Sequence, residues 1–408
     1  RQQENAMTQE VILRPTEEKA WQWISGAFGF YRNIELDAPV TFKYDGIDEL
    51  ILANANAGIH TVFPKANLQI REEQFPIESH FKLPAFGMSL YHQSDRKVGR
   101  WKFLAGIRFD YERTAIRYAN SANIHYRFTL TMPEYKLLPV EMDGRQSKAF
   151  FEVMPKVAVM YATGAGNLYL TVAQGYKTGG YNTQIFSDLL QNRLMSRMMS
   201  DLGVYFSGYE TGYDVESAIS YKPEYSWNYE AGGHFRLFNG KLFVDAALFY
   251  MDCRNQQLTV FPPGKTTGRL MSNAGRTRSF GAELSADYRY GNLHLTGNYG
   301  HTNAKFIVFD NGNDNYSGKR IPYAPINTVS ANCEYRLDVS HRWIDHLLFN
   351  IGWQGVGKIY WNEDNTISQP FYSFPNAYVA LKKNAVVMGL WGKNLTETEY
   401  ATFYFKSV

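Results

Sequence analysis

The sequence lacks the features that mark several common protein classes. Its 408 residues include only two cysteines, Cys253 and Cys333, too few for a disulfide framework and without metal-ligand spacing. No run of about 18 or more apolar residues occurs, so no transmembrane helix is predicted. The net charge of +3 is too small to indicate a nucleic-acid partner.

Catalytic signatures are also missing. No pair of histidines has zinc-ligand spacing on one element, and no nucleophile elbow, P-loop or dinucleotide-binding glycine motif occurs. We therefore expect neither an enzyme, nor a metal site, nor a cofactor. The N-terminus is polar from its first residue and shows no signal peptide.

Aromatic residues and period-two alternation are what the sequence has in abundance. Aromatic residues make up 16% of the chain. Apolar and polar side chains alternate over long runs, such as 101–112, 229–238, 279–301 and 329–338. A strand of about twelve residues, tilted by about 40°, is long enough to cross the hydrocarbon core of a bilayer.

The connections between these runs alternate between short and long. Tight turns are predicted at 164–167, 239–240, 291–292 and 383–384, and long links at about 116–147, 178–220, 254–275, 303–324 and 361–371. This order is typical of an up-and-down barrel with tight turns on one rim and loops on the other, and we expect roughly sixteen strands.

The apolar face is predicted to meet lipid and the polar face to line a wet interior. Strand length and loop order favour this arrangement over a soluble β-sandwich. So do aromatic residues near strand ends, where a membrane interface would hold them: Trp21, Trp23, Trp101, Trp227, Tyr250, Tyr288, Tyr290, Trp361 and Trp391. The predicted fold class is therefore all-β, a transmembrane antiparallel up-and-down β-barrel.

The longest link carries the strongest helix candidate, within "TQIFSDLLQNRLMSRMMSDL". Ser187 or Asp188 could cap this helix, and Leu190, Leu194 and Met198 would share one face. The helix either packs the link onto the rim or forms a moving lid.

Candidate ligand-binding residues lie at strand ends and loop roots. Tyr176 and Lys177 end a strand, and Tyr181 and Asn182 follow a Gly179–Gly180 pair that would turn the chain sharply. These four either grip a ligand by stacking and charge or hold the rim in shape. Arg254 and Arg276, with Arg278, flank another link and would attract anionic ligands or face lipopolysaccharide phosphates.

Five stretches of the sequence resemble the barrel of TonB-dependent outer-membrane receptors: 21–32, 167–182, 221–258, 273–290 and 390–400. They carry a P-E-x-x-x-x-Y-E strand, an A-x-F-Y strand, an N-A-G-x-x-x-x-x-G-x-E element and a near-terminal W-G-x-N-L-x-x-x-x-Y element. The matching residues are Pro223, Glu224, Tyr229, Glu230, Ala247, Phe249, Tyr250, Asn273, Ala274, Gly275, Gly281, Glu283, Trp391, Gly392, Asn394, Leu395 and Tyr400.

The resemblance implies a barrel of about 22 strands with a plug folded inside. It also implies active import of a bulky ligand across the bacterial outer membrane, powered by the TonB complex. The ligand would be a ferric siderophore, or haem, cobalamin or a glycan. No plug matches this chain, so we expect residues 1–408 to be a receptor barrel incomplete at both ends, with a helix-containing loop at about 178–220. The alternatives are a passive porin, an outer-membrane enzyme and a soluble glycan-binding protein.

Overall fold

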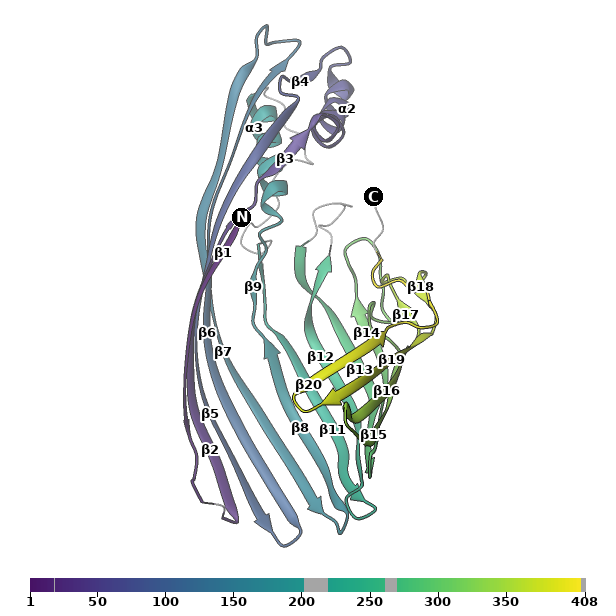
Figure 1. The fold of residues 1–408 in the computed structure, drawn as a ribbon. Coiled ribbons are helices and arrows are strands. Elements are labelled where there is room, and N and C mark those ends of the chain that lie inside the picture. The colour runs from purple at the N-terminus through teal and green to yellow at the C-terminus, as the bar shows by residue number, and fades with distance from the viewer. Residues whose placement is uncertain (18, 202–218, 261–269, 405–408) are drawn as a thin grey trace.

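One antiparallel sheet dominates the computed structural model, which describes residues 1–17, 19–201, 219–260 and 270–404. The sheet contains sixteen strands, as the alternation predicts. Fourteen of them follow one another around a curved wall (Figure 1). They are β1 (Gln2–Leu13), β2 (Trp21–Asp37), β5 (Gln74–Val98), β6 (Trp101–Phe128), β7 (Lys136–Ala162), β8 (Gly166–Lys177), β11 (Glu224–Leu237), β12 (Leu242–Val260), β13 (Leu270–Tyr290), β14 (Leu293–Phe309), β15 (Asn327–His341), β16 (Ile344–Val356), β19 (Tyr372–Lys383) and β20 (Val386–Gly392).

Neighbouring strands of the wall are also neighbours in the sequence, apart from the short strands inserted in links. Two-residue turns join β5 to β6, β13 to β14, β15 to β16 and β19 to β20. At the β11–β12 turn, Asn239 and Gly240 adopt positive φ angles of 56° and 81°, which these residue types tolerate best. Longer connections alternate with these turns, which confirms the predicted up-and-down order.

Apolar side chains cover one face of the wall without being buried. On β6, Phe103 is 51% exposed, and four further residues of the same face are 39% to 47% exposed: Trp101, Ile107, Phe109 and Tyr111. The intervening residues of β6 are polar at Arg108, Asp110 and Glu112. An exposed face of this composition matches the predicted lipid-facing surface.

Above the lipid-facing part of the wall, β5, β6 and β7 continue into a tall extension with a hydrophobic core of its own (Figure 1). The extension comprises 38–85, 113–149 and 180–201. Within these ranges lie β3 (Val40–Lys43), β4 (Leu68–Ile70), α1 (Tyr44–Ile47), the π-helical turn η1 (Asp48–Leu52), α2 (Ala53–Val62) and α3 (Phe186–Asp201). Within the described residues, no helix is both apolar and long enough to cross a membrane.

The extension corrects two predictions. The link expected at about 116–147 is the upper part of the β6–β7 hairpin, which is paired without interruption from Trp101–Tyr161 to Tyr126–Lys136. The helices at 44–62 were not predicted, because their sequence includes Gly46, Asn54, Asn56 and Gly58, which are weak helix formers.

The helix α3 follows its prediction in one respect and departs from it in another. Leu190, Leu194 and Met198 are buried together, as the spacing predicts. The helix begins at Phe186, so neither Ser187 nor Asp188 precedes it as a cap. Phe186 is instead inserted between Phe81 and Tyr118, with ring centroids 5.0 and 4.6 Å away.

Aromatic side chains mark two levels of the wall, as predicted for a membrane interface. Trp101 and Tyr161 pair at the short-turn end with ring centroids 4.7 Å apart. Tyr250 of β12 lies directly between Tyr229 of β11 and Phe280 of β13 at the other level. Trp361 is an exception to the prediction. It is buried in the connection between β17 (Ile359–Tyr360) and β18 (Ser368–Gln369), where its ring meets Tyr323 edge-on.

Candidate ligand-binding site

Polar side chains reach across the concave face of the wall to strands that are not their neighbours. The Tyr91 hydroxyl on β5 donates to Glu10 on β1 at 2.8 Å, across the intervening β2. Tyr225 on β11 also donates to Glu152 on β7 at 2.7 Å, from the face of β11 that carries Tyr229 and lies opposite Glu230. Side chains on neighbouring strands converge only on the inside of a curve, so the polar face is the inner one.

The best-formed polar group on this inner face surrounds the end of β8. Arg108 forms an ion pair with Asp110 (Nε to Oδ1, 2.7 Å) and donates from Nη2 to the Ser89 hydroxyl at 2.8 Å. The Tyr176 hydroxyl donates to Glu112 at 3.4 Å. We call these five residues the Tyr176 cluster.

The two carboxylates of the cluster are almost completely covered, with Asp110 7% and Glu112 9% exposed. Arg108 forms an ion pair with Asp110, whereas the Glu112 carboxyl group accepts the hydrogen bond of Tyr176. Beside it lies an open cavity of about 220 Å³, whose walls include Phe28, Phe30 and Thr178 as well as cluster residues. Aromatic rings, a phenol and acceptor oxygens around one cavity can hold a flat organic ligand by stacking and hydrogen bonding.

Tyr176 reaches the cluster because β8 separates from β7 above its middle. The pairing of β7 with β8 ends at Lys156–Ala173, whereas β8 and β11 remain paired up to Lys177–Glu224. The upper β8–β11 ribbon is thus free to lie against carboxylates of β6 and β7.

The other predicted residues of this loop root are in different surroundings. Lys177 is exposed at the end of β8, opposite Glu224. Tyr181 lies in β9 (Gly180–Tyr181), paired with β10 (Ser220–Tyr221), and packs against the extension core. Asn182 is buried, and its amide group exchanges two hydrogen bonds with the Met271 backbone at 2.8 and 2.9 Å.

At Gly179, the backbone of this loop root passes close to the backbone of β10. A Cβ atom on Gly179 would lie 2.4 Å from the Tyr221 carbonyl oxygen, so no larger residue fits without a shift of the backbone. Together with the bonds of Asn182, this packing ties the start of the link to β10 and β13.

Arg254 and Arg276 meet at one carboxylate. Arg276 binds both oxygens of Asp252, at 2.9 and 3.1 Å, and Arg254 donates from Nε at 3.0 Å. Asp252 is 6% exposed and lies two residues beyond Tyr250 on the same face of β12. The strand registers place Arg254 in one row with Tyr225 and Tyr176, on the face that also carries Tyr229 and Tyr250.

The sequence analysis did not identify Arg108, Asp110 and Glu112 as candidates for the site. They form the polar face of one predicted strand, a position shared by many residues of the chain. A possible signal was two carboxylates two residues apart beside an arginine, which places all three on one face. Within the described residues, no group of three or more His, Cys, Asp or Glu side chains could hold a metal ion.

A second polar surface lies lower on the inner face. The Tyr169 hydroxyl donates to Glu230 at 2.6 Å, and His234 pairs with Asp245 at 2.6 Å. Together with Glu283, these residues line an open pocket of about 390 Å³. Three carboxylates make this surface suitable for cationic or hydrogen-bond-donating groups placed inside the wall.

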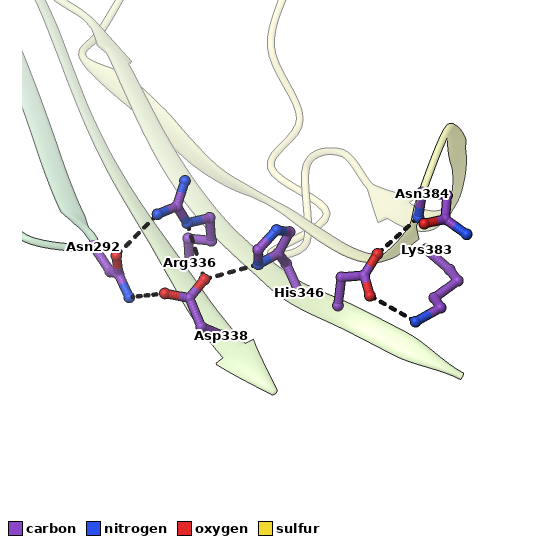
Figure 2. Close-up of polar contacts among 7 residues, drawn as sticks. Asn292, Arg336, Asp338, His346, Lys383 and Asn384 are labelled. Carbon is purple, nitrogen blue, oxygen red and sulfur yellow. Dashed lines mark hydrogen bonds and ion pairs between the residues drawn. The ribbon is translucent and has the colours of Figure 1, made fainter. Parts of the chain in front are cut away.

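Polar contacts also fix the short-turn rim (Figure 2). Asp338 accepts hydrogen bonds from Asn292 at 3.0 Å and from His346 at 2.8 Å, which connects the β13–β14 turn to β15 and β16. Asp345 pairs with Lys383 at 2.7 Å and accepts the backbone N–H of Asn384 at 2.8 Å. These contacts link successive hairpins, so we interpret them as structural.

In the extension, one carboxylate fixes the end of α3. Asp201 accepts hydrogen bonds from Lys136 and from the Tyr126 hydroxyl, both at 2.7 Å. The Lys136 and Tyr126 hydrogen bonds hold the pKa of Asp201 below its usual value, while burial raises the pKa of Tyr126. This contact and the buried face of α3 favour the prediction of a packed link over that of a moving lid.

Comparison with known proteins gives one family match. The family model described as "TonB dependent receptor-like, beta-barrel" matches residues 20–395. Among curated proteins, the pesticin receptor of Yersinia enterocolitica is 24% identical over 297 residues, or 71% of this chain and 35% of that protein. The pesticin receptor of Yersinia pestis is 23% identical over 328 residues, or 79% of this chain and 40% of that protein.

Solved structures share the fold. The ferric yersiniabactin uptake receptor FyuA from Yersinia pestis aligns with a TM-score of 0.67 and 19% identity, over 100% of this chain and 51% of FyuA. The siderophore receptor PiuA from Acinetobacter baumannii aligns with a TM-score of 0.52 and 13% identity, over 97% of this chain and 61% of PiuA. The chain thus spans about a third to three fifths of the length of these relatives.

Proposed function

Because this chain belongs to the TonB-dependent receptor β-barrel family of the bacterial outer membrane, we propose that it forms the barrel wall of a receptor that imports a ferric siderophore. Energy would come from the TonB complex through a plug inside the wall. Further proposed partners are outer-membrane lipid and lipopolysaccharide, and we propose no nucleic-acid partner. The family and the structural neighbours are receptors and transporters, and we propose that this protein is likewise not an enzyme.

The observation that carries this proposal is the distribution of side chains over the wall. Apolar residues are exposed on the outer face, and buried ion pairs and hydrogen bonds line the inner face. Together with the family match, this arrangement supports a membrane-embedded wall around a polar passage.

We further propose that the Tyr176 cluster and Lys177 contact the ligand as it enters. A siderophore presents polar oxygens and often aromatic rings, and its ferric complex can carry negative charge. The Tyr176 phenol and the rings of Phe28 and Phe30 offer hydrogen bonding and stacking beside the cavity, and the exposed Lys177 offers a cation. Because Asn182 has both sides of its amide bound to backbone, we assign it a positioning role.

Uptake measurements test the transport proposal. A strain that lacks the protein should fail to accumulate one radiolabelled ferric siderophore under iron limitation, and a strain that lacks TonB should fail equally. Unimpaired uptake without TonB would favour a passive porin and contradict the proposal.

Binding measurements test the site. Tyr176→Phe should weaken equilibrium binding of that siderophore to cells by roughly three- to tenfold, because one hydrogen bond is lost. Tyr169→Phe, which removes a hydroxyl lower on the inner face, is the matched control and should leave the affinity unchanged. Equal effects of the two variants would contradict a role for the Tyr176 cluster.

A further inference from the structure

A single side chain ties together both roots of the long link between β8 and β11. The Gln257 amide on β12 donates from Nε2 to the Thr178 carbonyl at 2.8 Å and to the Lys222 carbonyl at 3.2 Å. The Lys177 carbonyl accepts from the same nitrogen at 3.4 Å. Because Thr178 follows β8 directly and Lys222 comes just before β11, the two roots of the link meet at one amide group.

An irregularity in β12 places Gln257 where its side chain reaches the link. The pairing of β12 with β13 shifts register on both sides of Gln256. Asn255, within the first shift, has a positive φ angle of 52°, which asparagine tolerates better than most residues. Register shifts of this kind redirect side chains that would otherwise follow the alternation of the sheet. Gln257 lies in the second shift, where the Glu224 carboxyl group accepts its backbone N–H at 2.8 Å.

The second root is also fixed by another residue. Asn273 on β13 exchanges two hydrogen bonds with the Lys222 backbone, at 2.6 and 2.8 Å. Gln257, which is only 7% exposed, thus ties Thr178 to a root that is already held in place. Without its amide, the carbonyl oxygens that converge on it would lose a buried partner, and the first root would move away to reach water.

The tied residues adjoin the proposed ligand site. Thr178 lines the cavity beside the Tyr176 cluster, and Tyr176 and Lys177 come immediately before it in the chain. The hydrogen bond from the Tyr176 hydroxyl to Glu112 is 3.4 Å long, so a small further displacement of the end of β8 would break it. Gln257 therefore acts on the site through the backbone that carries these side chains.

We propose that Gln257 is a positioning residue of the ligand site, which fixes the direction in which Tyr176 and Lys177 leave the wall. A site held in its bound geometry before the ligand arrives binds more tightly, because less conformational freedom is lost on binding. This inference rests on the proposed function, since it gives the site of siderophore contact a residue that holds it in place.

The first test measures the geometry without a siderophore. Spin labels on cysteines that replace the exposed Lys177 and Arg113, in a Cys333→Ser background, report the separation of the end of β8 from β6. The parent protein should give one narrow distance distribution. Gln257→Met, which keeps the length of the side chain but removes the amide, should broaden it. A distribution that stays equally narrow in this variant would overturn the proposal.

Gln69→Met is the matched control for this test. It also removes a hydrogen-bonded amide, because Gln69 accepts from Arg127 in the extension at 2.7 Å. The control should leave both the label distances and the siderophore affinity unchanged. Equal broadening in the two variants would indicate a general loss of stability and contradict a specific role for Gln257.

The second test asks whether Gln257 acts through Tyr176. Gln257→Met should weaken equilibrium binding of the radiolabelled ferric siderophore of the uptake assay by about three- to tenfold, because it disturbs the contact that Tyr176→Phe removes. The double variant should bind about as weakly as either single variant, since both changes act on one contact. Effects that multiply in the double variant would show that Gln257 acts apart from Tyr176 and would refute the positioning role.

The two tests separate this inference from the transport proposal. Because the label distances are measured without a siderophore, failure of the wild type to bind any siderophore would refute the transport proposal and leave the geometric test decisive for Gln257. Binding that is weakened by Tyr176→Phe but not by Gln257→Met would refute the positioning role alone.

Discussion

The two halves of β6 show how one strand serves two environments. From Trp101 to Tyr111 the odd-numbered residues are apolar and exposed, and the even-numbered Arg108, Asp110 and Glu112 face inward. From Ile116 to Phe128 the even-numbered residues, apart from the polar Asn120, form the buried apolar side, with Ile124 completely covered. The strand pairing with β7 continues through both halves without a shift.

The apolar residues therefore change from the odd-numbered to the even-numbered face of β6, although the strand pairing continues unchanged. The neighbouring strands change at the same height. On β5, Met88 and Leu90 are exposed whereas Phe75, Ile77 and Phe81 are buried, and on β7, Phe151 is exposed whereas Leu138 and Met142 are buried. Apolar side chains turn outward where lipid surrounds the wall and inward where water does, so the change of phase marks the outer membrane boundary.

The largest expected effect tests the core of the extension. Phe186→Ala leaves a cavity between Phe81 and Tyr118 and should cost about 3–5 kcal/mol of the stability of the extension. Phe103→Ala, at an exposed position of the wall, should cost far less. Limited proteolysis of cells would show cleavage within the extension for the first variant only, and equal resistance of both variants would contradict a packed core.

The second test exchanges identical residues across the boundary. Ala105 and Ala119 are both exposed on the odd-numbered face of β6, below and above the change of phase. Ala105→Lys should destabilise the wall by about 2–4 kcal/mol because a charge enters the lipid. Ala119→Lys should change stability by less than about 0.5 kcal/mol. Urea-dependent unfolding in lipid vesicles measures both, and similar values would remove the boundary.

A smaller effect is expected where the two regions are joined. Asn182→Ala deprives the Met271 backbone of two hydrogen bonds and should loosen residues 178–185 by about 1–3 kcal/mol. Hydrogen exchange should rise there. In Asn365→Ala, which removes the equivalent pair of bonds to Arg320, it should rise near Arg320 instead. Exchange that stays unchanged at 178–185 in the first variant would show that Asn182 does not anchor the link.

The smallest effect concerns pH. The lowered pKa of Asp201 means that its bonds to Lys136 and Tyr126 stabilise the extension above the usual value of 3.8, and that this contribution disappears as the pH falls through the lowered value. The thermal midpoint of the extension should fall as the pH is lowered through 3.8 and below, less so in Asp201→Asn. Equal pH dependence of variant and wild type would contradict this role.

The wall could be predicted because its pattern is local. Alternation at 101–112 and 279–301, together with tight turns at 239–240 and 291–292, determines strand, face and direction without knowledge of the rest of the chain. The alternation predicts a link at 116–147, where the structure has a hairpin. In this stretch the apolar residues change from odd to even positions, which interrupts the alternation that predicts a strand. Tyr176 was predicted from its place at a strand end, but its partner Glu112 lies 64 residues earlier.

The sequence by itself determined the alternation, the short turns, the outward apolar face and the family, since each depends on residues near one another in the chain. Only the tertiary structure decided that β8 separates from β7 to bring Tyr176 to buried carboxylates, that Asn182 is bound to Met271, and that Arg254 and Arg276 bind the same carboxylate, Asp252. The physical reason is that these features depend on strand register and on which medium surrounds each height of the wall. Both are properties of distant residues brought side by side.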